Sequence, residues 1–128
     1  MKILRFSLFC ESHYEETSWS RKLDGKNVTI TIKDVEKLLN SGIEKISVTE
    51  IADMCVHKGK TDKGTLERSE KSNLEYPIIV SKDLKGNFNM ILDGHHRLLK
   101  AINNKMDTIN ARILDLSKCP KEYQLMFN

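Results

Sequence analysis

Apolar and polar positions alternate most clearly in the second half of the chain. Residues 77–81 and 88–92 are rich in β-branched and aromatic side chains, and the polar segment 84–87 between them contains a glycine. This arrangement predicts a β-hairpin. Apolar residues then recur three and four positions apart over 98–106, which predicts an amphipathic helix. The apolar run 109–114 predicts a closing strand.

The first half of the chain carries weaker patterns. A loose alternation over residues 3–10 and a clear one over 28–32 predict two strands. The polar segment 11–26 between them predicts a loop or an irregular arm. Asp34, with apolar residues at helical spacing after it, predicts a helix that Gly42 ends.

The remaining segments complete a predicted fold class. Residues 45–48 predict another short strand. Glycine, lysine and threonine cluster over residues 57–75 without apolar periodicity, which predicts a long loop of the kind that often forms a lid or a binding segment. A short helix is predicted after Pro120. The whole pattern predicts an α+β fold in one domain over residues 1–128, a small mixed β-sheet with packed helices and an extra N-terminal strand-and-helix segment over residues 1–42.

The composition is that of an ordinary soluble globular protein. Hydrophobic residues make up 39% and charged residues 30% of the 128 positions. The net charge of +3 weakly favours anionic partners and does not by itself indicate nucleic-acid binding. No apolar stretch approaches a membrane span, and the three cysteines form no Cys-x-x-Cys pair that would indicate a zinc or dithiol site. We expect a cytoplasmic protein of a prokaryote or a phage-infected prokaryotic host, with reduced thiols.

The segment Asp93-Gly94-His95-His96-Arg97 carries the most informative chemistry. It lies between a predicted strand and a predicted helix, so the first N–H groups of that helix are unpaired and the positive end of its dipole lies there. Two imidazoles and a guanidinium add side-chain donors, and an arginine binds phosphate through two hydrogen bonds. The segment therefore predicts a phosphate site, most simply for a nucleotide.

Each residue of this segment also has a structural interpretation. Asp93 would cap the helix or begin a turn; in the functional interpretation it would hold Mg²⁺ or accept a proton. Gly94 would admit a phosphate close to the backbone or supply a positive φ angle. His95 and His96 point about 100° apart on a helix, so one metal ion does not easily bind both. Arg97 is unfavourable in the first helical turn unless an anion or a carboxylate compensates its charge.

A longer pattern surrounds this segment. It consists of Tyr76-Pro77-Ile78-Ile79-Val80, a polar hairpin, Met90-Ile91-Leu92-Asp93-Gly94-His95-His96-Arg97-Leu98, Ala101 and Ala111-Arg112-Ile113-Leu114-Asp115. This order resembles the ParB/sulfiredoxin superfamily. With a preceding strand at 46–51, the resemblance covers roughly residues 45–116 and leaves the first 42 residues unexplained. It implies a ParB/sulfiredoxin-like fold in which this strand, turn and helix hold nucleotide phosphates.

Three branches of that superfamily differ at the turn. Sulfiredoxins have Gly-Gly-Cys-His-Arg, whereas this chain has His95 in place of the nucleophilic cysteine. Chromosome-partition ParB proteins bind CTP and have Gly-Glu-Arg-Arg, and no helix-turn-helix segment follows the motif here. Free-serine kinases have Asp-Gly-His-His-Arg, which this chain matches residue for residue. That match implies that Asp93, His95 and His96 serve phosphate transfer, and that Gly94 and Arg97 join both histidines in binding phosphate.

One departure from the kinases concerns the base of their reaction. They use an upstream glutamate that acts on the serine hydroxyl, and the corresponding stretch of this chain contains His57 but no glutamate. Glu50 and Glu67 are the nearest acids. Arg68 and Ser69 are further candidates, because they would fold over a bound nucleotide.

The leading expectation is a protein that binds ATP or ADP with Mg²⁺ and, if it is an enzyme, transfers phosphate to a small hydroxyl substrate as a kinase-like phosphotransferase. Two alternatives stay open. One is a nonenzymatic accessory module of a phage or mobile element that binds a host protein or a nucleotide signal. The other is a ParB-like nuclease acting on DNA, against which the low net charge and the lack of a basic stripe weigh. No membrane partner is expected.

Overall fold

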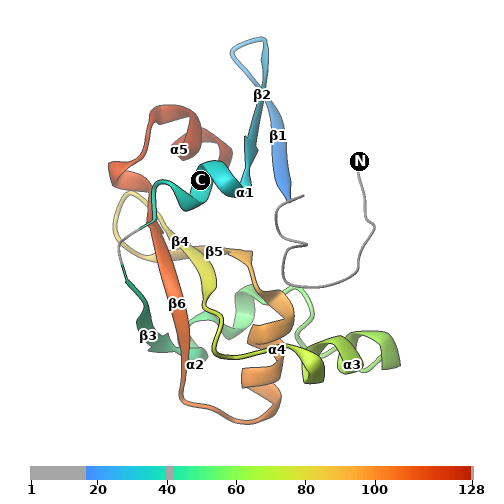
Figure 1. Cartoon of the computed structure of the whole chain (residues 1–128). Helices are drawn as coiled ribbons and strands as arrows, with labels where there is room; N and C mark the ends of the chain where they lie inside the picture. The colour runs from blue at the N-terminus through green and yellow to red at the C-terminus, as the bar shows by residue number, and fades with distance from the viewer. Residues whose placement is uncertain (1–16, 40–41, 128) are drawn as a thin grey trace.

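The computed structural model describes residues 17–39 and 42–127, which form a mixed α+β arrangement (Figure 1). A four-stranded sheet lies at its centre. Its strands follow the order β3 (Glu44–Ser47), β6 (Thr108–Asp115), β4 (Ile78–Lys82) and β5 (Phe88–Asp93). β4 pairs in parallel with β6, and the other two pairings are antiparallel. The predicted β4–β5 hairpin and the mixed sheet are therefore confirmed.

A second hairpin precedes this sheet and projects from the molecule (Figure 1). It consists of β1 (Ser18–Leu23) and β2 (Lys26–Thr31), which pair antiparallel, and it leads directly into α1 (Ile32–Glu36). The strand predicted over residues 3–10 lies outside the described residues. The arm predicted over 11–26 is wrong in its second half, because β1 occupies most of it and Ser20 and Thr29 join their hydroxyls across the pair at 2.9 Å.

The other helical elements are short and lie between or after the strands of the large sheet. They are α2 (Val48–Ile51), the 3₁₀ turn η2 (Ala52–Met54), α3 (Lys63–Lys71), α4 (His95–Asn103), the 3₁₀ turn η3 (Leu116–Lys118) and α5 (Lys121–Phe127). α4 and α5 confirm two predicted helices, although α4 begins three residues earlier than the apolar spacing indicates. Within the described ranges, none of the helices has the length and apolar character needed to cross a bilayer.

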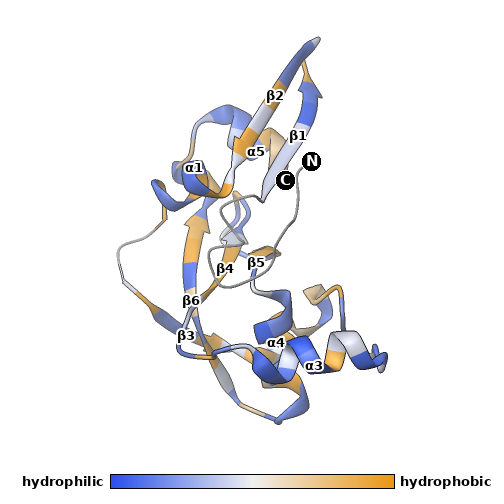
Figure 2. Cartoon of the chain, turned by 45° about the vertical axis from the view of Figure 1, so that its right-hand side comes forward, coloured by the Kyte–Doolittle hydropathy of each residue, from blue (hydrophilic) through white to orange (hydrophobic). Residues whose placement is uncertain are grey.

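Both faces of the large sheet are buried. Successive residues of a strand point to opposite faces, so in β4 the side chains of Ile78 and Val80 join one apolar cluster and Ile79 joins the other. Ile91 and Leu92 of β5 divide in the same way. The first cluster includes residues of α2 and α4, and the second includes residues of β2, α1 and α5. Figure 2 shows the hydrophobic colours along β4 and β6, whereas the tip of the β1–β2 hairpin is largely hydrophilic.

The N-terminal hairpin and the C-terminal helix cover the second face of the sheet together. The rings of Trp19 and Phe127 meet edge to face with their centroids 5.0 Å apart. The Arg21 Nη1 atom donates a hydrogen bond to the Leu125 carbonyl at 2.8 Å. The described part of the N-terminal segment, which the family resemblance leaves unexplained, is therefore part of the apolar core.

Two elements differ from their predictions for local reasons. The first is α1, which begins at Ile32 and ends at Glu36, so the predicted helix after Asp34 is misplaced. Thr31 is its N-cap: the Asp34 N–H donates to the Thr31 hydroxyl at 3.2 Å, and the Thr31 N–H donates to the Asp34 carboxylate at 3.0 Å. Asp34 is thus the third residue of the helix and closes a capping box with Thr31, rather than preceding the helix.

The second is α3, which lies inside the segment predicted as a long loop. The Asp62 carboxylate caps its N-terminus by accepting from the Thr65 N–H at 3.0 Å. At the other end, the Lys100 ammonium of α4 donates to the carbonyls of Glu70 and Ser72, each at 2.8 Å. A cap from another helix stabilises α3, and no local apolar pattern could reveal that contact.

Candidate functional site

The turn between β5 and α4 places a helix N-terminus at the edge of the large sheet. Gly94 is the N-cap of α4 and has a φ of +99°. The Leu98 N–H donates to the Gly94 carbonyl at 2.9 Å, which is the first hydrogen bond of the helix. The N–H groups of His95, His96 and Arg97 therefore have no carbonyl partner within α4 and carry the positive end of its dipole.

Arg97 is compensated by a carboxylate of the same segment. Its Nη2 atom lies 3.0 Å from Oδ2 of Asp93 and donates to the Pro77 carbonyl at 3.3 Å. The pair is mostly buried, with side-chain exposures of 15% for Arg97 and 21% for Asp93. Any role of Asp93 as a base or as a ligand of Mg²⁺ therefore competes with this ion pair.

A loop far away in the sequence brings a third histidine to this turn. The His57 and His96 rings stack with their centroids 4.3 Å apart and their planes 33° apart. The His57 and His95 rings meet nearly at right angles, with centroids 6.1 Å apart. Three of the four histidines of the chain thus gather in one cluster, which we call the histidine corner and define as His57, His95, His96 and Arg97.

Backbone contacts fix this loop against α4. The Val56 N–H donates to Nδ1 of His95 at 3.3 Å, and the Cys55 thiol lies 3.4 Å from the His95 carbonyl oxygen. A ring nitrogen that accepts a hydrogen bond carries no proton, so His95 is neutral with its proton on Nε2. Burial raises the pKa of the Cys55 thiol, so this cysteine is a poor nucleophile.

Burial and neighbouring positive charges keep the imidazoles uncharged. Burial, followed by the charges of His57 and Arg68, lowers the pKa of His96 to about 4. Burial is also the largest cause of the lowered pKa values of His57 and His95. At neutral pH the corner therefore holds three neutral rings beside two arginines.

Two buried nitrogen atoms of the corner lack a hydrogen-bond partner. They are Nδ1 of His57 and Nε of Arg97, and they are the only such side-chain atoms found in residues 17–39 and 42–127. Buried polar groups are almost always paired, and the exceptions often mark sites where a ligand or water belongs. Both exceptions lie within the same cluster.

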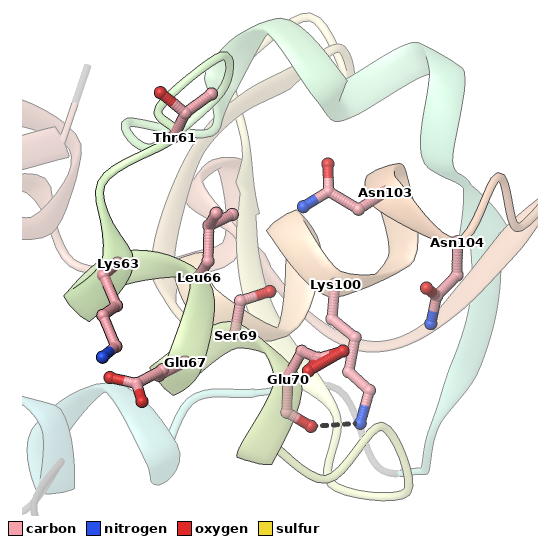
Figure 3. A pocket seen from close by; sticks show the side chains of 9 residues that line it. All are labelled: Thr61, Lys63, Leu66, Glu67, Ser69, Glu70, Lys100, Asn103 and Asn104. Atoms are coloured by element: carbon pink, nitrogen blue, oxygen red, sulfur yellow. Dashed lines mark hydrogen bonds between the residues drawn. The ribbon is translucent and has the colours of Figure 1, made fainter.

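The predicted candidates on α3 divide between two places. The charge of Arg68 acts on His57 and His96, so this residue belongs beside the corner. Glu67 and Ser69 instead line a pocket of about 480 Å³ between α3 and α4 (Figure 3). The other residues lining it are Thr61, Lys63, Leu66, Glu70, Lys100, Asn103 and Asn104. Glu50 lies on α2, on an exposed position of that helix.

The pocket begins one helical turn from the corner, because Lys100 follows His96 by four residues on α4. Ser69 forms part of its wall with an exposure of only 2%, and its hydroxyl points toward α4 (Figure 3). Pockets of this volume accommodate small molecules. The corner and the pocket therefore lie on the same helix, about one turn apart.

The donor set of the corner does not fit a protein-held metal ion. In the described ranges, no group of three or more histidine, cysteine, aspartate or glutamate side chains is arranged to hold one. The rings of His57 and His96 stack on each other, with their planes 33° apart. Asp93, the residue predicted to bind Mg²⁺, is paired with Arg97 instead.

Comparisons with family models, with curated proteins and with solved structures found no match. The ParB/sulfiredoxin-like assignment therefore stays a prediction from the sequence motif.

Proposed function

We propose that this chain binds the phosphate groups of an ATP- or ADP-type nucleotide at the N-terminus of α4, in a ParB/sulfiredoxin-like domain. The observation that carries the proposal is the convergence at the histidine corner. Three N–H groups at the start of α4 have no partner within that helix and lie in the same turn as the side chains of His95, His96 and Arg97. Two buried nitrogens of the corner have no hydrogen-bond partner. Such an arrangement favours a compact anion.

The pocket between α3 and α4 supports a ligand larger than a free phosphate. It lies along α4 from Lys100 onward, one helical turn beyond His96, and is lined by hydroxyl, amide, ammonium and carboxylate groups together with Leu66. A nucleotide bound with its phosphates at the corner would have space there for its remaining atoms. This proximity along α4 supports a nucleotide over an inorganic anion.

If the protein is an enzyme, the same site would transfer phosphate to a small hydroxyl substrate. Arg97 would turn from Asp93 toward the transferred phosphate, which would free the carboxylate to accept the proton of the attacking hydroxyl. The α4 N–H groups and the arginines would stabilise the charge that develops on the phosphate oxygens. Positioning and charge stabilisation account for most of the catalysis in reactions of this class.

A nonenzymatic nucleotide-binding module is the second candidate. Two carboxylates act on the histidines of the corner, Asp62 and Asp93. Asp62 caps α3 and Asp93 is bound to Arg97, so both are engaged. A panel of small alcohols separates the candidates: tight binding of ATP without a phosphorylated product favours the module.

Two substitutions at the ion pair test nucleotide binding. Arg97→Ala removes a charge-assisted phosphate contact and should weaken ATP and ADP binding about 10- to 100-fold. Asp93→Asn removes the carboxylate that competes for Arg97 and should tighten binding. Isothermal titration calorimetry with Mg²⁺-nucleotide measures both dissociation constants.

Lys85→Ala is the matched control for charge, because Lys85 is an exposed residue of the β4–β5 turn. It removes one positive charge without touching the corner, and its dissociation constant should equal that of the wild type. A wild type that binds no nucleotide, or affinities unchanged in both ion-pair variants, would contradict the proposal.

A further inference from the structure

The stacked pair of His57 and His96 is an unusual feature of the corner. The two rings come from different elements, the loop before α3 and the first turn of α4, and their centroids are 4.3 Å apart. Two imidazolium ions at this separation would repel each other strongly in a partly buried site. The pair therefore does not carry two charges, and burial together with nearby positive charges lowers the pKa of both rings, so the pair is neutral at neutral pH.

The charges facing the pair are mainly positive. Arg68 of α3 and Arg97 of α4 act on His96, and Lys60 of the loop together with Arg68 acts on His57. Among the described residues, Asp62 is the negative group that acts on His57, and its carboxylate is engaged in capping α3. A ligand that brings two or more negative charges would reverse this balance.

We propose that His57 is a further phosphate-binding residue, and that the His57–His96 pair takes up a proton when an anion binds at the N-terminus of α4. This inference rests on the proposed function and adds its proton dependence. The anion stabilises one imidazolium by direct attraction, and the second ring stays neutral, which avoids the repulsion between two charged rings. The buried Nδ1 atom of His57 has no hydrogen-bond partner in the free protein, and a bound anion would stabilise its protonated form.

The direction of the pH dependence follows from linkage. The pair has lowered pKa values in the free protein and higher ones in the complex, so the complex binds more protons than its separate components. Affinity for the anion must then rise as the pH falls. Uptake of one proton gives a change of up to about tenfold in the dissociation constant per pH unit between the free and bound pKa values.

Sulfate is a suitable probe because it keeps both charges throughout this range. Its dissociation constant, measured by titration between pH 8 and pH 6, should fall by roughly 10-fold or more with decreasing pH. The Cε1 proton resonances of His57 and His96, followed by NMR with and without saturating sulfate, should show a higher pKa in the complex for at least one of them.

His57→Gln and Lys60→Gln form the matched variants. His57→Gln keeps a polar side chain but cannot take up a proton, so most of the pH dependence of sulfate binding should be lost. Lys60→Gln removes a charge that acts on His57 but removes no proton acceptor. The affinity for sulfate should therefore fall at every pH, while its dependence on pH stays the same.

Three results would overturn the inference. They are sulfate affinity that does not change with pH, unchanged histidine pKa values in the complex, and a full pH slope retained by His57→Gln. In each of these cases anion binding itself persists, so the proposed function would stand. Absence of binding at every pH, in contrast, would remove the proposed function as well.

Discussion

Replacing Gly94 by alanine should lower the free energy of unfolding by about 2–5 kcal/mol. The residue has a φ of +99°, where a side chain strains the backbone. An added Cβ would also lie 2.6 Å from Cγ2 of Ile78, on the buried strand β4, and 3.1 Å from Nη2 of Arg97. Urea denaturation followed by circular dichroism measures the loss.

Gly86→Ala separates backbone strain from crowding. Gly86, in the β4–β5 turn, has a φ of +88°, and an added Cβ there meets no atom within 4 Å. Gly86→Ala should lower the free energy of unfolding by only about 1 kcal/mol, which is the contribution of the left-handed backbone alone. Equal losses in the two variants would show that the contact with Ile78 is not what requires glycine at the turn.

Leu114→Ala should also lower the free energy of unfolding by about 2–5 kcal/mol. Leu114 lies on the opposite face of the sheet from the Gly94 turn's neighbour Ile78. The side chain of Leu114 is completely buried, in the cluster shared with Ile32, Val35 and Phe127. Alanine would leave a cavity beneath α1 and α5. Trp19, the single tryptophan, packs on Phe127 and reports this region by fluorescence during urea denaturation.

Leu84→Ala is the control for Leu114→Ala, because Leu84 is 52% exposed in the β4–β5 turn. It should change the free energy of unfolding by less than about 0.5 kcal/mol. If both faces belong to one cooperative unit, tryptophan fluorescence and circular dichroism will give the same midpoint in Leu114→Ala. A separate, earlier fluorescence transition would mean that the second face unfolds independently of the rest.

The sequence predicted the elements whose stability depends on their own apolar pattern. The β4–β5 hairpin and α4 show clear periods of two and of about 3.6 residues, and the structure contains both. In α3 only Thr65, Leu66 and Ser69 are even partly buried, and only Leu66 of these is apolar, so the pattern is too sparse to identify the helix. Its signals were the cap residues Asp62 and Thr65, three positions apart, which could have been recognised.

The site was predictable in part. The sequence required either an anion or a carboxylate near Arg97, and the structure supplies Asp93, four residues earlier and one turn away. The stacking of His57 on His96 was not predictable, because it depends on how a loop without regular structure folds back on α4. The role of Lys100 in capping α3 was hidden for the same reason.

The covering of the second sheet face by the two ends of the described chain has a consequence for biosynthesis. Strands β4, β5 and β6 emerge from the ribosome before α5, so the apolar side of Ile79 and Leu92 stays partly open to water until α5 has emerged. Contacts between β1 and α5 join segments at great sequence separation, which slows closure of this layer. During that interval, the nascent polypeptide is most exposed to self-association and most dependent on chaperones.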